Sequence, residues 1–262
     1  MFGRYIERLR NQPKKVRFLV SRLLRHSHIC RLLTISRDGY VLRFYPTALS
    51  CTYWFDPQAR DDDEHVLAEF LGVGDTFVDV GANIGALTLK AASLVGSGGR
   101  VVSFEPDSAT FGYLCGNCRL NRADHVKAYQ CALGEKPGEV HFSRTKSDDQ
   151  NCIADEGAGA VTVRRLDGVI VTGTWIKLLK IDVEGFELFV LRGAGDLLAT
   201  TETIYFESWE RHYSKYGYST GEVLSFLREA GFVIHRMGRK GWQAITGDYV
   251  SAQCENLLAR RV

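Results

Sequence analysis

Four of the predicted strands each have an acidic side chain at their end. These side chains are Asp79, Glu105, Asp182 and Glu207. Where parallel strands alternate with helices, ligands bind beyond the carboxyl ends of the strands, so we expect these side chains at one rim of the sheet. A single acid at such a place could be a helix cap. Four acids that converge on one rim indicate a polar ligand and the chemistry performed on it.

The segment 76–85, Thr-Phe-Val-Asp-Val-Gly-Ala-Asn-Ile-Gly, runs from an apolar strand into two closely spaced glycines. Glycine lets the backbone turn tightly and approach a ligand, and the start of the following helix favours a carboxylate or phosphate group. Glu105 lies twenty residues after Gly85, at the end of the next apolar run. An acid at that place can accept hydrogen bonds from ribose hydroxyls, so we predict a site for an adenosine cofactor.

The spacing of the glycines distinguishes two kinds of adenosine cofactor. Dinucleotides are bound by the pattern G-x-G-x-x-G, whereas this chain has Gly81-x-x-x-Gly85 with Asp79 just inside the turn. A carboxylate there would repel a pyrophosphate but attract the ammonium and sulfonium groups of S-adenosyl-L-methionine. The pattern therefore favours S-adenosyl-L-methionine over a dinucleotide, and over a tight turn without a ligand.

The hydrophobic pattern from residue 75 onward alternates between strand and helix, which predicts an α/β fold with a mostly parallel sheet and helices on both faces. Strands are expected at 76–80, 100–104, 126–131, 139–143, 160–165, 175–181, 203–206, 232–236 and 243–246, and helices at 84–95, at 107–121, from about 186 and at 221–230. The acidic run 61–64 has the composition of a helix start. A polar loop is expected from 144 to about 159.

The N-terminal region is basic, because residues 1–33 hold nine Lys or Arg and one Glu, a formal charge of +8 in a chain whose total is +2. Apolar residues recur at helical spacing from Lys14 to about Arg25, so this stretch is predicted to be a basic amphipathic helix. Three interpretations stay open: a helix packed on the domain, contact with an anionic membrane surface, or binding of nucleic acid or an acidic protein. Short strand-like runs follow between 33 and 56.

Length and composition agree with an enzyme domain that has a small appendage. A chain of 262 residues with 45% hydrophobic content can bury a sizeable core, and no apolar run approaches the ~18 residues of a membrane span. We expect an N-terminal helical and β appendage at 1–60 and the main domain at 61–262. The seven cysteines form no paired framework and the start lacks a signal-peptide pattern, so a cytoplasmic protein is expected, peripheral to the membrane if its basic helix makes that contact.

Several motifs together resemble the FkbM family of S-adenosylmethionine-dependent methyltransferases. They are Phe77–Gly85, Phe104-Glu-Pro106, Ala132-Leu-Gly134, Arg165-Leu-Asp167, Lys180-Ile-Asp-Val-Glu-Gly-Phe-Glu187 and Leu191-Arg-Gly-Ala194. The resemblance covers about residues 73 to 210, and Asp-Val-Glu-Gly is its most selective part. It implies the class I methyltransferase (Rossmann-like) fold and methyl transfer to a hydroxyl oxygen, often of a sugar or polyketide.

The resemblance also implies roles for individual residues, position by position. The cofactor's methionine part would be surrounded by Asp79, Gly81, Ala82, Asn83 and Gly85. Its ribose would be bound by Glu105, with Pro106 beside it, and its adenine would lie against Ala132. Asp182 would face the sulfonium and the incoming hydroxyl, with Glu184 next to it.

Methyl transfer to oxygen needs an aligned nucleophile and a group that takes its proton. In one route Asp182 or His212 is the general base, and histidine is the better proton acceptor near neutral pH. In the other route a divalent cation held by Asp182 and Glu207 lowers the pKa of the hydroxyl. We expect an O-methyltransferase acting on a saccharide or glycolipid; the alternatives are a non-catalytic adenosine-nucleotide-binding scaffold and a methyltransferase with a nucleic-acid or protein acceptor.

Overall fold

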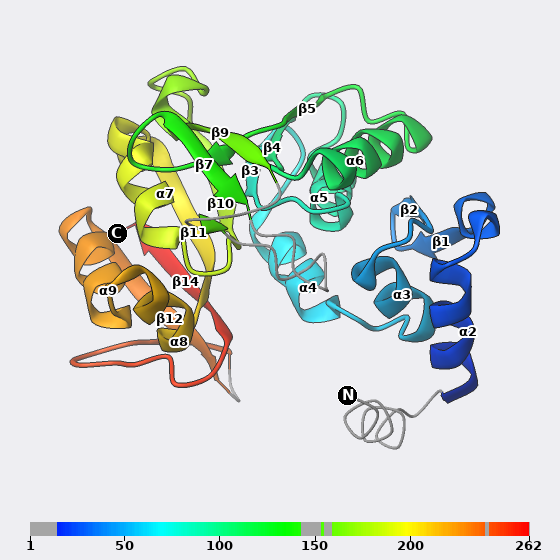
Figure 1. The fold of residues 1–262 in the computed structure, drawn as a ribbon. Coiled ribbons are helices and arrows are strands. Elements are labelled where there is room, and N and C mark those ends of the chain that lie inside the picture. Colours follow the sequence, from blue (N-terminus) through cyan, green and yellow to red (C-terminus); the bar gives the residue numbers. More distant parts are fainter. Residues whose placement is uncertain (1–14, 143–152, 155–158, 239–240, 262) are drawn as a thin grey trace.

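An eight-stranded sheet forms the centre of the molecule, with the strand order β13-β12-β14-β11-β10-β3-β4-β5 (Figure 1). The computed structural model describes residues 15–142, 153–154, 159–238 and 241–261. The strands are β3 (Thr76–Val80), β4 (Arg100–Phe104), β5 (Val126–Tyr129), β10 (Ile176–Ile181), β11 (Thr201–Ser208), β12 (Phe232–Gly238), β13 (Gly241–Ala244) and β14 (Glu255–Arg261). The five strands from β5 to β11 pair in parallel, as predicted, and β14 runs antiparallel between β11 and β12.

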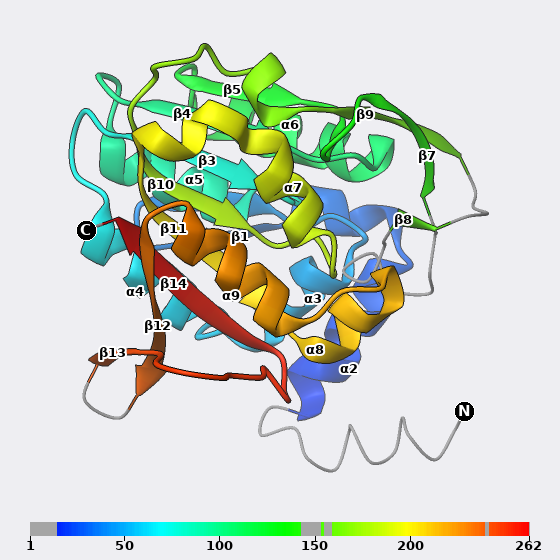
Figure 2. The same ribbon diagram turned by 90° about the vertical axis from the view of Figure 1, so that its left-hand side faces the viewer.

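Helices cover both faces of this sheet (Figure 2). One face packs against α7 (Glu187–Ala194) and α9 (Thr220–Glu229), and the other packs against α4 (Asp61–Phe70) and α5 (Ala86–Val95). Side chains of β3 alternate between these two hydrophobic clusters, with Val78 and Val80 in the first and Phe77 in the second. Helix α6 (Ser108–Leu120) connects β4 to β5, so the predicted strand-helix alternation of the core is confirmed.

The N-terminal unit packs against the same face as α5. It consists of α2 (Lys15–Arg25), η1 (His28–Leu32), the antiparallel pair β1 (Thr34–Arg37) and β2 (Tyr40–Arg43), and α3 (Ala48–Phe55). Leu42 and Phe44 are fully buried in one cluster with Leu67 and Leu89, so a continuous hydrophobic core extends across residue 60. The division into 1–60 and 61–262 stays a prediction.

Part of this unit differs from the sequence-based expectation. The stretch 48–55, expected among short strand-like runs, forms α3 instead. Its start is capped by Thr47, whose side-chain oxygen accepts a hydrogen bond from the backbone N–H of Ser50 at 3.0 Å. Helix α2 has the predicted position and buries Phe18 while leaving Val16 and Leu23 each 75% exposed.

A second, smaller sheet has the strand order β6-β9-β7-β8 and follows β5 in the chain. Its strands are β6 (Ala132–Leu133), β7 (Gly138–Phe142), β8 (Ile153–Ala154) and β9 (Ala160–Arg164). Most of the expected polar loop 144–159 lies outside the described residues. Short helical segments complete the structure: η2 (Leu166–Gly168), η3 (Gly195–Thr200), α8 (Glu210–Tyr213) and η4 (Ser214–Tyr216).

The C-terminal strands depart most from the prediction. The strand expected at 243–246 is β13 at 241–244, and β14 was not predicted at all. Within β14 only the short run 257–259 is apolar, and it is fully buried between two neighbouring strands. Among the described residues, no helix combines the length and apolar composition that crossing a membrane requires.

Candidate functional site

A pocket opens at the carboxyl ends of β3, β4 and β10. Predicted site residues that line it are Gly81, Ala82, Asn83, Glu105, Pro106, Ala132, Asp182 and Glu184. Lining residues without a predicted role include Leu49, Tyr53, Arg60, Lys180 and Phe186. Asp79, Gly85, Glu207 and His212 are not among the lining residues and stand behind or beside them. The N-terminal unit thus contributes to the pocket wall through α3 and the turn before α4.

The turn after β3 brings the backbone directly against the loop after β10. Gly81 has a φ of 79°, and a Cβ atom on it would lie 1.9 Å from the carbonyl oxygen of Asp182. Gly85 has a φ of 88°, and a Cβ there would lie 2.5 Å from Cδ1 of Leu114, the end of a flexible side chain. Asn83 also has a positive φ, 51°, which is uncommon for residues other than glycine. The close approach to the loop after β10 therefore requires glycine at position 81.

Glu105 closes this turn with its carboxylate. Its Oε2 accepts a hydrogen bond from the backbone N–H of Asn83, and its Oε1 accepts one from the backbone N–H of Asp107, both at 2.9 Å. The residue is 6% exposed, and burial raises the pKa of its carboxyl group to about 7 despite the two backbone donors. Glu105 is therefore a poorly solvated acceptor with lone pairs left for a ligand.

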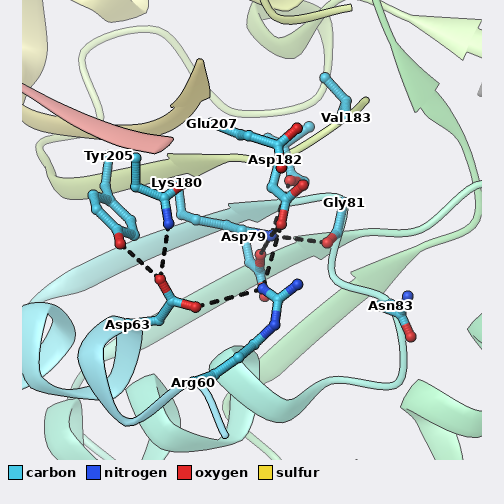
Figure 3. Close-up of polar contacts among 12 residues, drawn as sticks. Arg60, Asp63, Asp79, Gly81, Asn83, Lys180, Asp182, Val183, Tyr205 and Glu207 are labelled. Carbon is cyan, nitrogen blue, oxygen red and sulfur yellow. Dashed lines mark hydrogen bonds and ion pairs between the residues drawn. The ribbon is translucent and has the colours of Figure 1, made fainter. Parts of the chain in front are cut away.

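Asp79 is fully buried and forms an ion pair with Lys180 (Figure 3). The Asp79 carboxylate lies 3.1 Å from the Lys180 ammonium and accepts a 2.6 Å hydrogen bond from the Thr88 hydroxyl. The Lys180 ammonium also donates to the carbonyl of Gly81 at 2.9 Å. Burial alone would lower the pKa of Lys180, but Asp79 and Asp182 raise it, so the lysine stays charged. This pair fixes the glycine turn on the sheet, while a direct contact of Asp79 with the cofactor stays a prediction.

Asp182 is held between two cations at the pocket wall (Figure 3). Its Oδ2 lies 3.5 Å from Nη1 of Arg60 and 3.8 Å from Nζ of Lys180. Burial opposes ionisation, but the two cations prevail and the pKa of Asp182 is lowered. Arg60 also lies 3.5 Å from Asp63, whose carboxylate accepts a 2.7 Å hydrogen bond from Tyr205. Asp182 is therefore a fixed negative charge at neutral pH.

A second polar group lies beyond Asp182 and consists of Glu184, Glu207 and His212; we call it the rim cluster. Nδ1 of His212 lies 3.5 Å from Oε2 of Glu184 and 3.4 Å from Oε2 of Glu207. The other oxygen of Glu207, Oε1, accepts a hydrogen bond from the thiol of Cys254 at 3.0 Å. The imidazole is 9% exposed and lies beside the Trp209 ring. Two carboxylates thus face one buried imidazole nitrogen.

The loop that carries Asp182 and Glu184 is held by backbone hydrogen bonds to the side chain of Glu187. Oε1 of Glu187 accepts hydrogen bonds from the backbone N–H groups of Val183, at 3.0 Å, and Gly185, at 3.4 Å. Glu187 is 1% exposed, and burial raises the pKa of its carboxyl group to about 8. A Cβ atom on Gly185 would lie 2.8 Å from the carbonyl oxygen of His212, so this glycine allows the loop to pack against α8.

The structure groups the predicted catalytic residues differently from the expected pairs. The carboxylates expected to share a cation were Asp182 and Glu207, but Asp182 is engaged by Arg60 and Lys180. The side chains with metal-ligand spacing are instead those of the rim cluster. Glu184 has a φ of 57°, and left-handed conformations of such residues are concentrated at functional sites.

Two of the pocket cations were given no role in the sequence analysis. Lys180 could have been recognised, because a lysine at the end of the apolar strand 176–181 needs a buried partner. Arg60 carries no such signal, since it precedes α4 in a turn outside all motifs and reaches the pocket only through its left-handed backbone, φ 58°.

The comparison with family models gives a match to the Methyltransferase FkbM domain over residues 79–234, more than half of the chain. This range contains the glycine turn after β3, Glu105 and the rim cluster.

Curated relatives and solved structures agree with this match. The chain is 34% identical over 149 residues to Methyltransferase 1 of Beauveria bassiana, covering 47% of this chain and 59% of that protein. It is 27% identical over 176 residues to the hexuronic acid methyltransferase AglP of Haloferax volcanii, covering 65% of this chain and 71% of the relative. The crystal structure of a putative rRNA-methylase from Clostridium thermocellum shares the fold, with a TM-score of 0.50, 15% identity, and coverage of 77% of this chain and 95% of that one.

Proposed function

Because the chain belongs to the FkbM methyltransferase family, we propose that it transfers the methyl group of S-adenosylmethionine to a hydroxyl oxygen of a saccharide or glycolipid. The fold is that of a class I methyltransferase, and S-adenosylmethionine is the cofactor. The observation that carries the proposal is the position of the rim cluster, in which Glu184 lines the pocket and His212 lies 3.5 Å from it.

The residues of the pocket fit this cofactor. Gly81 lets the turn after β3 pack directly against the backbone of Asp182, and both residues line the pocket. Glu105 offers a buried carboxylate for the ribose hydroxyls, and Ala132 and Phe104 offer apolar walls for the adenine. Asp182 places a negative charge at the wall, which suits a cationic sulfonium.

The chemistry then requires a nucleophilic oxygen at the rim. When bound, S-adenosylmethionine supplies an electrophilic methyl group. Glu184 and His212 stand where an acceptor hydroxyl can be oriented and lose its proton. Two routes for that proton fit these residues: direct transfer to His212, which Glu207 would support as an imidazolium, or ionisation of the hydroxyl on a bound divalent cation.

The substrate class is supported by one relative and by one side chain. The name of the Haloferax relative assigns it a hexuronic acid as substrate. Arg60 is 39% exposed at its side chain and lines the pocket, so it can pair with an acidic or hydroxyl-rich sugar. We propose methyl transfer to a hydroxyl. Transfer to a sugar carboxylate would contradict this proposal.

The test is methyl transfer from isotope-labelled S-adenosylmethionine to methyl glycosides of hexoses and hexuronic acids. We expect a labelled product that survives mild alkali, because a methyl ether is stable to alkali and a methyl ester is not. Loss of the label in alkali would show transfer to a carboxylate. Binding of S-adenosylhomocysteine without transfer to any saccharide would favour a non-catalytic scaffold or an acceptor of another class.

We also propose that α2 contacts an anionic membrane surface. Val16 and Leu23 lie on its exposed side, each 75% exposed, and Ile29 and Leu32 of the following η1 are also exposed, at 62% and 82%. Five of the nine basic residues of the N-terminal region lie between Lys15 and Arg31, and such a basic and apolar surface suits anionic headgroups. Co-sedimentation with phosphatidylserine vesicles should fall when Leu23→Glu is introduced and stay unchanged with Val171→Glu, an exposed apolar residue outside this region.

A further inference from the structure

The rim cluster has the spacing of a metal site. Ligand atoms of Glu184, Glu207 and His212 all lie within 4.8 Å of one another, and the two glutamate oxygens are 3.5 and 3.4 Å from the imidazole nitrogen. Metal–ligand bonds of about 2.1 Å place neighbouring ligand atoms roughly 3.0–3.4 Å apart. The two distances to the imidazole are therefore close to those around a bound ion.

The imidazole nitrogen provides an independent observation. Nδ1 of His212 is buried and has no hydrogen-bond partner, although it points at two carboxylates. A buried polar atom without a partner costs free energy unless something else satisfies it. Among the described residues, Glu207 forms no ion pair with a lysine or arginine, because Lys180 and Arg60 pair with Asp182 instead. Within the described part of the chain, the buried imidazole nitrogen thus faces two carboxylates without a hydrogen-bond partner.

We propose that Glu184, Glu207 and His212 bind one divalent cation of the Mn²⁺ type. Two carboxylates and one imidazole form a mixed oxygen and nitrogen donor set, which suits a cation between the hard Mg²⁺ and the softer Zn²⁺. The Cys254 thiol donates to Oε1 of Glu207 and holds this carboxylate in place as an outer partner. Three protein ligands leave coordination positions open, as in metal sites that act on a substrate.

The position of the cation gives it a role in the proposed reaction, and this role rests on the proposed function. Glu184 lines the pocket, and His212 lies 3.5 Å from Glu184 and 3.4 Å from Glu207. A cation there would bind the acceptor oxygen, orient it toward the methyl group and lower the pKa of its hydroxyl. The hydroxyl proton then leaves to solvent from the cation-bound oxygen, so direct transfer to His212 is not needed.

The test is Mn²⁺ binding to the full chain after treatment with a chelator, measured by electron paramagnetic resonance of the free ion. We expect one Mn²⁺ per chain, and affinity at least about tenfold weaker in Glu207→Gln and in His212→Ala. Nitrogen modulation in the spin echo of bound Mn²⁺ should be present in the wild type and absent in His212→Ala. Glu202→Gln, the same change at the opposite end of β11, should bind Mn²⁺ like the wild type.

The outcomes separate this inference from the proposed function. Absence of stoichiometric Mn²⁺ binding, or equal binding in the wild type and both cluster variants, overturns the metal site. Titration with S-adenosylhomocysteine on the same preparations tests the cofactor pocket independently, since that ligand needs no acceptor and no cation. A protein that binds Mn²⁺ but not S-adenosylhomocysteine keeps the metal site and loses the methyltransferase reaction, and the converse result does the opposite.

Discussion

Glu105 is the residue whose replacement tests the cofactor pocket most directly. Its carboxylate is 6% exposed and already holds two backbone N–H groups at 2.9 Å. In Glu105→Ala the ribose hydroxyls would lose their acceptor, and a buried polar group without a partner costs about 1–3 kcal/mol. We therefore expect the dissociation constant for S-adenosylhomocysteine to rise by roughly 5- to 150-fold, measured by calorimetric titration.

The pH dependence of binding gives the same assignment a second readout. Burial raises the pKa of Glu105 to about 7, and ribose hydroxyls donate best to the ionised form. Affinity should therefore be fully present above pH 7 and be lost as the pH falls through 7, by about tenfold for each pH unit below it. Glu105→Gln carries no titrating group, so its affinity should be weaker but flat between pH 6 and 8.

Asp107→Ala is the matched control for the affinity measurement, but not for the pH profile, because the Asp107 charge itself helps to raise the pKa of Glu105. Asp107 lies in the same loop, caps α6 through hydrogen bonds from Ala109 and Thr110, and does not line the pocket. Its loss should lower stability by about 0.5–2 kcal/mol and leave the affinity for S-adenosylhomocysteine unchanged. Unchanged affinity in a folded Glu105→Ala protein would refute the ribose contact, and equal loss in both variants would mean that the loop has rearranged.

Three further substitutions test the parts around this residue. Gly81→Ala should destabilise the fold by about 2–4 kcal/mol in urea unfolding, whereas Gly74→Ala, with a φ of 89° but open space, should cost only about 1 kcal/mol. Asp182→Asn should lower kcat more than the affinity for S-adenosylhomocysteine, and equal losses would make its role structural. Burial raises the pKa of Glu187 from 4.5 to about 8, so its contribution to stability is full below pH 4.5 and is lost as the pH rises through 8. The free energy of unfolding should therefore fall by up to about 1.4 kcal/mol per pH unit between pH 5 and 8. Glu187→Gln should remove this decline when unfolding is measured over the same range.

The parallel core was predictable because its signals are local. Apolar runs such as 76–80 and 176–181 read as buried strands, and a pair of glycines next to an acid is a turn signal that needs no knowledge of the rest of the chain. Strand β14 gave no such signal, since its apolar run of three residues is too short to show a period. Its place between β11 and β12 is decided by pairing on both sides.

The rim cluster shows that strand ends predict which side chains lie at the rim but not which of them contact each other. Asp182 directly follows β10 and Glu207 lies near the end of the neighbouring parallel strand β11, so both stand at the carboxyl-end rim that the rule predicts (Figure 3). The rule says nothing about side-chain partners, and the partner of Asp182 is Arg60, from a turn more than a hundred residues earlier. Arg60 and Lys180 engage Asp182, and the carboxylate that lies with Glu207 around His212 is that of Glu184.

The family motifs account for only part of the pocket lining, and residues outside the motifs form the rest. The motif residues build the turn after β3, the Glu105 carboxylate and the loop 182–185. Tyr53 and Arg60 also line the pocket and lie outside every motif. We therefore expect that exchanging the N-terminal unit and the turn before α4 between relatives changes the acceptor while the affinity for S-adenosylhomocysteine stays constant.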